Sequence, residues 1–158
     1  MRATNTLRTI GLMLAWTAPL CALGALGEAP VAAGSVAALD ARVARHLPVQ
    51  AAQAYKQHAL ELSNGTSVQE FADLQGRVFA VRWSGPDLPD LGMLLGNYLP
   101  VFKASVQSAR QAGKRGGPVW VQSDGLVLLS TGVMGAFRGY AYLEGSVPPG
   151  VDVRALVQ

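Results

Sequence analysis

Residues 55–86 read YKQHALELSNGTSVQEFADLQGRVFAVRWSGP, and this stretch decides the fold class. Two turn signals, Asn64-Gly65 and Gln75-Gly76, separate segments that alternate in polarity or are rich in Val, Phe and Trp. Asn-Gly favours a two-residue hairpin turn because both residues accept a positive φ. Short turns of this kind make consecutive strands antiparallel. The pattern therefore predicts three antiparallel strands, over residues 54–62, 66–73 and 77–84.

A second group of strands is predicted nearer the C-terminus. Residues 118–123 and 126–131 read as two strands joined by Asp124-Gly125, another two-residue hairpin signal. Gly132 is expected to break this run, and residues 134–143 are expected to form a further strand.

One long amphipathic helix is predicted between the two groups of strands. Its apolar residues recur at three- and four-residue spacing and so share one stripe: Leu88, Leu91, Leu94, Leu95, Tyr98, Phe102, Val106 and Ala109. Pro100 lies inside this stretch, and its ring would clash with the carbonyl of Gly96, four residues earlier. We therefore expect a kinked helix, or two abutting helices, over residues 89–112. The alternative is a clean break at Leu99.

Shorter elements are expected at the two ends of this core. Ser35 is suited to cap a short helix over residues 38–47, which Pro48 would stop. Residues 151–158 follow a Pro-Pro-Gly sequence and are expected to be a short tail or an edge strand. The whole order predicts an α+β domain. In it, an antiparallel sheet of about six strands packs on one long kinked amphipathic helix, with a short N-terminal helix.

The first 27 residues have the pattern of a secretory signal. A basic head, Arg2 and Arg8, precedes a charge-free apolar run and then a segment of small residues. Cleavage requires small residues at the third and first positions before the cut, and both Ala22-Leu23-Gly24 and Ala25-Leu26-Gly27 satisfy this. We favour a cut after Gly24, which makes residues 1–24 the signal peptide and residues 25–158 a single domain.

An uncleaved membrane anchor is the rival interpretation of this segment. The charge-free run over residues 9–27 is barely as long as the roughly 20 apolar residues that span a bilayer, and Pro19 interrupts it. Lipid attachment at Cys21 is disfavoured because the preceding residue, Leu20, is not small. After signal cleavage we expect no stable insertion into the membrane, and a location in the periplasm or outside the cell.

Removal of the signal changes the charge and the thiol content of the chain. Cys21 is the only cysteine, so the mature chain would have neither a disulfide framework nor thiol chemistry. Loss of the two arginines of the signal reduces the number of basic residues from 13 to 11, whereas all 10 acidic residues stay. The net charge therefore falls from +3 to +1. This balance argues against nucleic acid as a partner.

The most unusual local chemistry is the block Trp83-Ser84-Gly85-Pro86-Asp87-Leu88-Pro89-Asp90. Trp83, Asp87 and Asp90, with Tyr98 about two helical turns further on, are the candidate ligand-binding residues. The acids would hold a cation or a basic group of a partner. The alternative is structural: Asp87 caps the helix, Asp90 favours the positive end of the helix dipole, and Trp83 belongs to the core.

Catalytic and metal-binding patterns are weak. His46 and His58 are the only histidines and have no adjacent cysteine or acidic cluster, so we expect no metal site and no cofactor. The sequence has no Gly-x-Ser-x-Gly elbow, and no catalytic residue is assigned. Glu61, Glu70 and Asp73 lie on neighbouring predicted strands, which leaves a carboxylate pair open.

Several segments resemble a known family. Residues 78–98 read VFAVRWSGPDLPDLGMLLGNY, and Ala25-Leu26-Gly27, YKQHALELSNGTSVQEF at residues 55–71 and a glycine-aromatic pattern near residues 135–142 agree with the same family. Together they resemble domain-of-unknown-function family 2844, a family of small exported bacterial proteins, over nearly the whole mature chain. The resemblance implies export and a single domain, and it supplies no activity.

The function expected from these observations is a non-enzymatic exported envelope protein, a small binding or accessory module with an envelope protein as a possible partner. Two alternatives stay open: a carboxylate-based hydrolase, and a subunit that pairs with a partner through the edge of its sheet.

Overall fold

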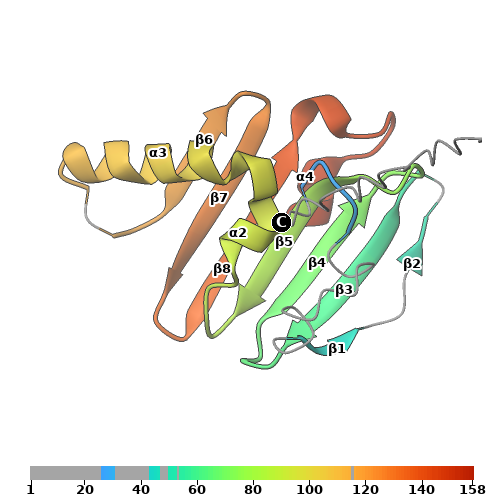
Figure 1. Cartoon of the computed structure of the whole chain (residues 1–158), viewed down its shortest axis with the longest axis horizontal. Helices are drawn as coiled ribbons and strands as arrows, with labels where there is room; N and C mark the ends of the chain where they lie inside the picture. Colours follow the sequence, from blue (N-terminus) through green and yellow to red (C-terminus); the bar gives the residue numbers. More distant parts are fainter. Residues whose placement is uncertain (1–25, 31–42, 47–49, 53, 115) are drawn as a thin grey trace, which may run out of the picture.

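An eight-stranded antiparallel sheet forms the centre of the computed structural model, which describes residues 26–30, 43–46, 50–52, 54–114 and 116–158 (Figure 1). Its strands follow the order β1-β3-β4-β5-β8-β7-β6, and β2 also pairs with β3. They are β1 (Val43–His46), β2 (Gln50–Ala51), β3 (Lys56–Leu62), β4 (Ser67–Ala72), β5 (Val78–Gly85), β6 (Val119–Ser123), β7 (Leu126–Val133) and β8 (Ala136–Leu143). The six longer strands confirm the predicted antiparallel sheet and the α+β class.

The hairpin turns lie where the sequence predicted them, but the prediction of two positive φ angles at Asn64-Gly65 was wrong, because only Gly65 has one. Gly65 has a φ of 82° and donates its N–H to the Leu62 carbonyl at 2.9 Å, which closes the turn between β3 and β4. Gly76 has the same φ in the turn between β4 and β5. Asp124 and Gly125 have φ values of 52° and 75°, the two positive angles of a type I′ hairpin.

Gly132 does not end its strand, so that expectation was wrong. Strand β7 continues through Gly132 to Val133, and the turn to β8 is formed by Met134 and Gly135. Gly132 has a φ of 146°, and a Cβ atom there would lie 2.5 Å from the carbonyl oxygen of Ala136. The absence of a side chain at Gly132 therefore allows the backbones of β7 and β8 to approach each other closely.

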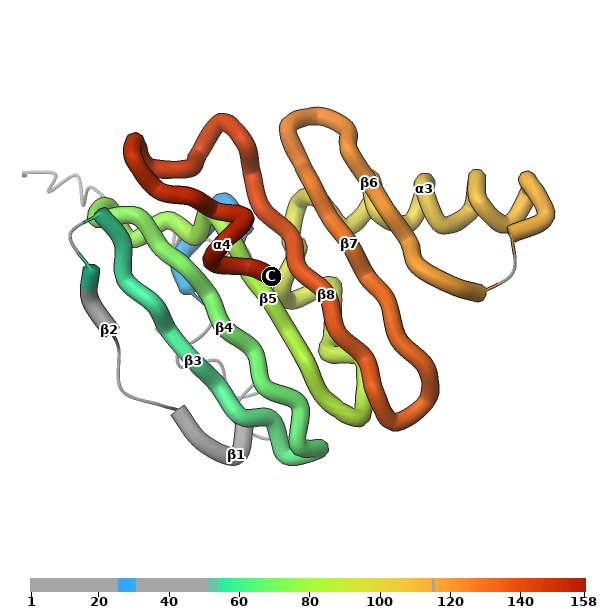
Figure 2. Tube along the Cα trace, turned by 180° about the vertical axis from the view of Figure 1, so that it is seen from behind, coloured from blue at the N-terminus to red at the C-terminus, as the bar shows by residue number. Residues whose placement is uncertain are grey.

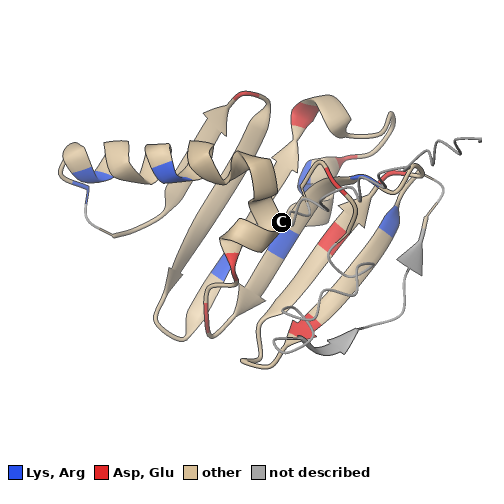
Figure 3. Ribbon diagram, viewed as in Figure 1, with Lys and Arg blue, Asp and Glu red and all other residues tan. Residues whose placement is uncertain are grey.

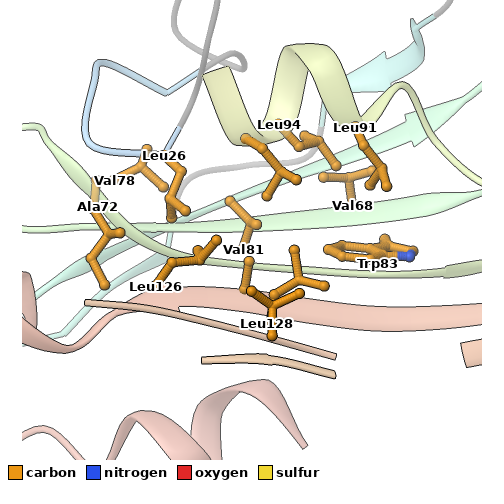
Figure 4. Packing of buried hydrophobic residues seen from close by; sticks show 14 of the residues in the cluster. Leu26, Val68, Ala72, Val78, Val81, Trp83, Leu91, Leu94, Leu126 and Leu128 are labelled. Carbon is orange, nitrogen blue, oxygen red and sulfur yellow. The ribbon is translucent and has the colours of Figure 1, made fainter. Parts of the chain in front are cut away.

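One side of the sheet, here called the helix face, is covered by α2 (Leu91–Leu95), the 3-10 turn η2 (Gly96–Tyr98) and α3 (Leu99–Gln111) (Figure 1). The largest buried cluster lies beneath these helices and includes Leu26, Val68, Val81, Trp83, Leu94 and Leu128 (Figure 4). Burial of this apolar surface is the main favourable contribution to folding.

Residues 89–112 were predicted to form a kinked helix or two abutting helices. Within this stretch the structure has two α-helices, α2 and α3, joined by the 3-10 turn η2. Helix α2 ends at Gly96, whose φ of 49° is unfavourable for residues with a side chain. Pro100 lies in the first turn of α3, where its missing N–H removes no intrahelical hydrogen bond. The interruption thus falls at the glycine and not at the proline.

The opposite side of the sheet, here called the groove face, is covered only in part, by α4 (Val153–Val157) at the C-terminus (Figure 2). Residues 151–158 were expected to be a tail or an edge strand, and that expectation was wrong. Asp152 caps α4 by accepting hydrogen bonds from the backbone N–H groups of Arg154 and Ala155. Val157 is buried against Phe71 and its neighbours, which anchors the helix.

The predicted N-terminal helix over residues 38–47 is wrong at Val43–His46, which form β1. This strand pairs with β3, opposite Leu60 and Leu62. The free edge of β3 supplies backbone hydrogen bonds there, and such tertiary pairing outweighs a weak local helix propensity. The other residues of that expected helix lie outside the described residues.

We predict that Gly139→Ala lowers the free energy of unfolding by about 1–3 kcal/mol or more, as in other overpacked cores. A Cβ atom at Gly139 would lie 2.4 Å from Cζ2 of Trp83 and 2.5 Å from the backbone oxygen of Leu129. Gly145→Ala is the control, because a Cβ atom there meets nothing within 4 Å. Urea denaturation of both variants measures the difference, and equal midpoints would contradict the packing described.

Candidate functional site

Trp83 belongs to the helix-face core. Its side chain is 2% exposed and lies among the buried residues beneath α2 (Figure 4). The indole Nε1 is buried and has no hydrogen-bond partner among the described residues. The ring lies over Gly139, the residue opposite it on β8, which has no side chain to displace it.

The two acids of the predicted block have different surroundings. Asp90, not Asp87, is the N-cap of α2, and its carboxylate accepts a hydrogen bond from the Gly92 N–H at 2.9 Å. The prediction that Asp87 caps the helix was wrong. Asp87 is exposed, and its backbone carbonyl accepts a hydrogen bond from Oγ1 of buried Thr66 at 2.9 Å. This bond ties the loop after β5 to the start of β4.

The four predicted ligand-binding residues do not surround one cavity. Tyr98 is half-buried against the helix-face core, beside Gly27. Of the four, only Trp83 borders the larger of the two grooves described below, and that groove lies on the other side of the sheet. A binding role for Asp87, Asp90 and Tyr98 stays a prediction without a shared cavity.

The groove face presents its side chains in rows that run across the strands. The outermost row is hydrophilic. In it Ser67 pairs with Ser84, Ser84 with Arg138, and Arg138 with Thr131. These residues occupy alternate strand positions to those in the helix-face core, so all four side chains share the groove face. Three hydroxyl groups thus flank one guanidinium group.

The next row toward α4 mixes polar and aromatic side chains. Gln69 pairs with Arg82, Arg82 with Tyr140, and Tyr140 with Leu129. Arg82 donates a hydrogen bond from Nη1 to the backbone oxygen of Leu156 at 3.1 Å, which fixes the side chain against α4. The ring of Tyr140 stacks on that of Tyr142, with centroids 6.2 Å apart and planes 20° apart.

The innermost row is apolar and is covered by α4. It contains Phe71, Ala80, Tyr142 and Val127, which pack against Val157. This covering leaves the two outer rows bare, and Figure 2 shows no helix in front of that part of β4, β5, β8 and β7.

The bare part of the sheet forms an open groove of about 790 Å³. It is bounded by the end of α4 and by the loops at Pro86 and Gly135, and none of its described lining residues is Asp or Glu. A second groove of about 310 Å³ on the other side of α4 includes Trp120, Glu144 and Arg154. Tyr140 lines both grooves.

This groove was not predicted from the sequence. Its signal was the recurrence of polar residues at alternate positions of otherwise apolar strands, as at Arg82 and Ser84 on β5. Alternation identifies two faces of a strand, but the coverage of each face depends on where the helices pack.

The carboxylate pair that the sequence left open is not formed by Glu61 and Glu70. Glu61 pairs with Ser67 and so faces the groove side, whereas Glu70 is fully buried on the helix face. Asp73 accepts hydrogen bonds from the backbone N–H of Arg77 at 2.8 Å and from its Nε at 3.3 Å. None of the three acids lines either groove.

His58 also lies away from the groove. His58 pairs with Glu70 on the helix face. Burial, and then the positive charge of Lys56, lowers the pKa of His58 from its ordinary value. Among the described residues, no group of three or more His, Cys, Asp and Glu side chains is arranged to hold a metal ion.

Comparison with known protein families identifies the family of this chain. A family model described as "Protein of unknown function (DUF2844)" matches residues 22–156. The chain belongs to this family. The match confirms the resemblance noted in residues 78–98, and it spans every described strand and most of α4. All described lining residues of the larger groove except Val157 and Gln158 lie within the matched region. No curated protein and no solved structure matches the chain. No helix in the described part of the chain is long and apolar enough to cross a membrane.

We predict that Asp90→Ala lowers the free energy of unfolding by about 0.5–2 kcal/mol, the usual effect of losing an N-cap. Asp90→Asn should retain most of the stability because asparagine also caps helices. Asp87→Ala is the matched control and should be close to neutral, because only its backbone carbonyl is used. Urea denaturation of the three variants tests this, and an equal loss in Asp87→Ala and Asp90→Ala would refute the assignment of the cap.

Proposed function

We propose that the protein is an exported, non-enzymatic binding module of the bacterial envelope and that the groove face holds its ligand. The observation that carries the proposal is the open groove of about 790 Å³, lined by hydroxyl, amide, guanidinium and aromatic groups. Ligand sites are concave and combine apolar walls with a few oriented polar groups. The described part of the groove has both.

The chemistry of the lining supports binding rather than catalysis. A nucleophilic serine or threonine needs a general base within hydrogen-bond reach. The groove contains Ser67, Ser84 and Thr131, but its described lining includes no histidine and no acidic side chain. The separation of Glu61 from Glu70 across the two faces of the sheet gives the hydrolase alternative no support.

The proposal of export rests on the signal-like sequence of residues 1–24 and gains support from the segment that follows it. Leu26 is 1% exposed and belongs to the helix-face core, next to Val78 and Leu94 (Figure 4). Its N–H donates to the Leu94 carbonyl at 3.1 Å, and the N–H of Gly27 donates to the Val78 carbonyl at 2.8 Å. Cleavage after Gly27 would remove Leu26 from the core, which favours cleavage after Gly24.

We therefore expect the intact mass of the exported protein to correspond to a chain that begins at Ala25. A recombinant chain that begins at Glu28 should be less stable than one that begins at Ala25 by about 2–5 kcal/mol, the usual effect of emptying a buried leucine site. Mass spectrometry of the exported protein and urea denaturation of the two chains are the measurements. An exported chain that starts at Glu28, or equal stabilities, would contradict the proposed processing.

The groove itself can be tested by filling it. We expect at least one member of a panel of neutral sugars, sugar acids, sugar phosphates and amino acids to raise the Tm of the wild-type protein, because a ligand that binds only the folded state stabilises it. Ser84→Trp places an indole in the groove and should abolish that rise. Ser108→Trp, at an exposed position on α3, should leave it unchanged.

Circular dichroism of both tryptophan variants checks that the fold is retained. A rise in Tm that persists in Ser84→Trp would mean that the ligand binds elsewhere. The absence of any rise across the panel would count against a small-molecule site in the groove.

A further inference from the structure

The two arginines of the groove lie close together on the central strands. Arg82 on β5 pairs with Tyr140 on β8, and Arg138 lies two residues before Tyr140. The two are diagonal neighbours on one face, and such neighbours have Cα atoms about 7–8 Å apart. Figure 3 shows the basic positions of β5 and β8 side by side, with the acidic positions of the sheet on β3 and β4.

No Asp or Glu side chain belongs to the described lining of the groove in which this pair lies. Arg82 is held by a backbone carbonyl, which is uncharged. The side chain of Arg138 is exposed and makes no hydrogen bond or ion pair with any described residue. Glu61 lies in the same row as Arg138 but three strands away, at about 14 Å for a strand spacing near 4.8 Å, and it has an interaction elsewhere.

Such a pair matches one chemical class of ligand. A guanidinium group donates two parallel hydrogen bonds to a carboxylate or a phosphate, and these charge-assisted bonds are stronger than bonds between neutral groups. Arg82 is oriented in advance by its bond to Leu156, while Arg138 has all of its donors available for a ligand.

The neutral groups around the arginines are more numerous than a single anion can use. Ser67, Ser84 and Thr131 contribute hydroxyl groups that both donate and accept hydrogen bonds. The Oε1 of Gln69 accepts a hydrogen bond from Gln57 at 3.2 Å, which leaves its amide N–H groups for a ligand. The ring of Tyr140, supported by Tyr142, supplies a flat wall.

We propose that the groove binds an acidic sugar, a small polyhydroxylated molecule whose carboxylate or phosphate lies between Arg82 and Arg138. The hydroxyl groups of the sugar then meet the serine and threonine row, and its ring lies against Tyr140. The groove volume of about 790 Å³ falls within the range of about 300–1,000 Å³ for small-molecule sites. This inference rests on the proposed function and names the ligand class for the same site.

Calorimetric titration of the chain that begins at Ala25 tests the inference with four probes: glucuronate, glucose 6-phosphate, glucose and inorganic phosphate. We expect glucuronate or glucose 6-phosphate to bind at least about tenfold more tightly than glucose and inorganic phosphate, because only the acidic sugars use both the arginines and the hydroxyl row. The comparison of the two acidic sugars identifies the anion as a carboxylate or a phosphate. Added salt should weaken the binding.

Arg138→Gln should weaken the binding of the acidic sugar roughly ten- to a hundredfold, the usual effect of losing a charge-assisted hydrogen bond. The variant should keep the wild-type Tm, because Arg138 has no partner among the described residues. Arg110→Gln is the matched control, since Arg110 is exposed in the last turn of α3, and it should bind as the wild type does.

Three results would overturn the inference. The first is that glucose and glucuronate bind equally tightly and glucose 6-phosphate does not bind, and the second is that Arg138→Gln binds the acidic sugar as tightly as the wild type does. The third is that inorganic phosphate binds as tightly as glucose 6-phosphate, so that the sugar adds no affinity. Failure of the proposed function is distinguishable from these results. If a neutral ligand binds and Ser84→Trp abolishes its binding, the groove is a site and only the acidic class is wrong. If Ser84→Trp changes nothing, the groove is not the site.

Discussion

The packing of Trp83 on Gly139 is the contact on which the rest of the structure depends. A Cβ atom at position 139 would lie 2.4 Å from the indole, so the ring can occupy the helix face only because glycine is opposite it. Side chains alternate along a strand, so the orientation of Trp83 directs Arg82 and Ser84 to the groove face. A slip of one residue would exchange the core with the polar rows.

The two faces of the sheet are then completed in different ways. The helix face receives α2, η2, α3 and the segment at Leu26, and it becomes the larger buried cluster. The groove face receives the short helix α4 with Val147 and Val151 before it, and among the described residues these cover one apolar row around Phe71 and Tyr142. The unequal coverage explains how a sheet with one conventional core also retains an open polar surface large enough for a ligand.

Local interactions account for the parts of the fold that were predictable. The turns at Asn64-Gly65 and Asp124-Gly125 depend on the positive φ angles of Gly65, Asp124 and Gly125, which are local properties of the backbone. A break or kink in the helical stretch near Pro100 was predicted from the sequence, although the residue that ends α2 is Gly96. The errors at Val43–His46 and at α4 share one cause, because each element depends on a contact with residues distant in the chain. The error at Gly132 has another cause, because there the glycine serves the close pairing of β7 with β8, the next strand of the same hairpin.

The sequence by itself determined the order of the six longer strands and their turns, the α+β class and the family, since these follow from periodicity, turn chemistry and motifs along the chain. It also identified Trp83 as unusual, but it gave no reason to connect Arg82 with Arg138, which are separated by most of the second half of the chain. Only the tertiary structure decided that β5 and β8 are neighbours, that α4 covers one row of their common face, and that the other rows stay open. The physical reason is that strand pairing and helix docking bury surfaces contributed by distant residues, and no local pattern specifies which surface is left uncovered.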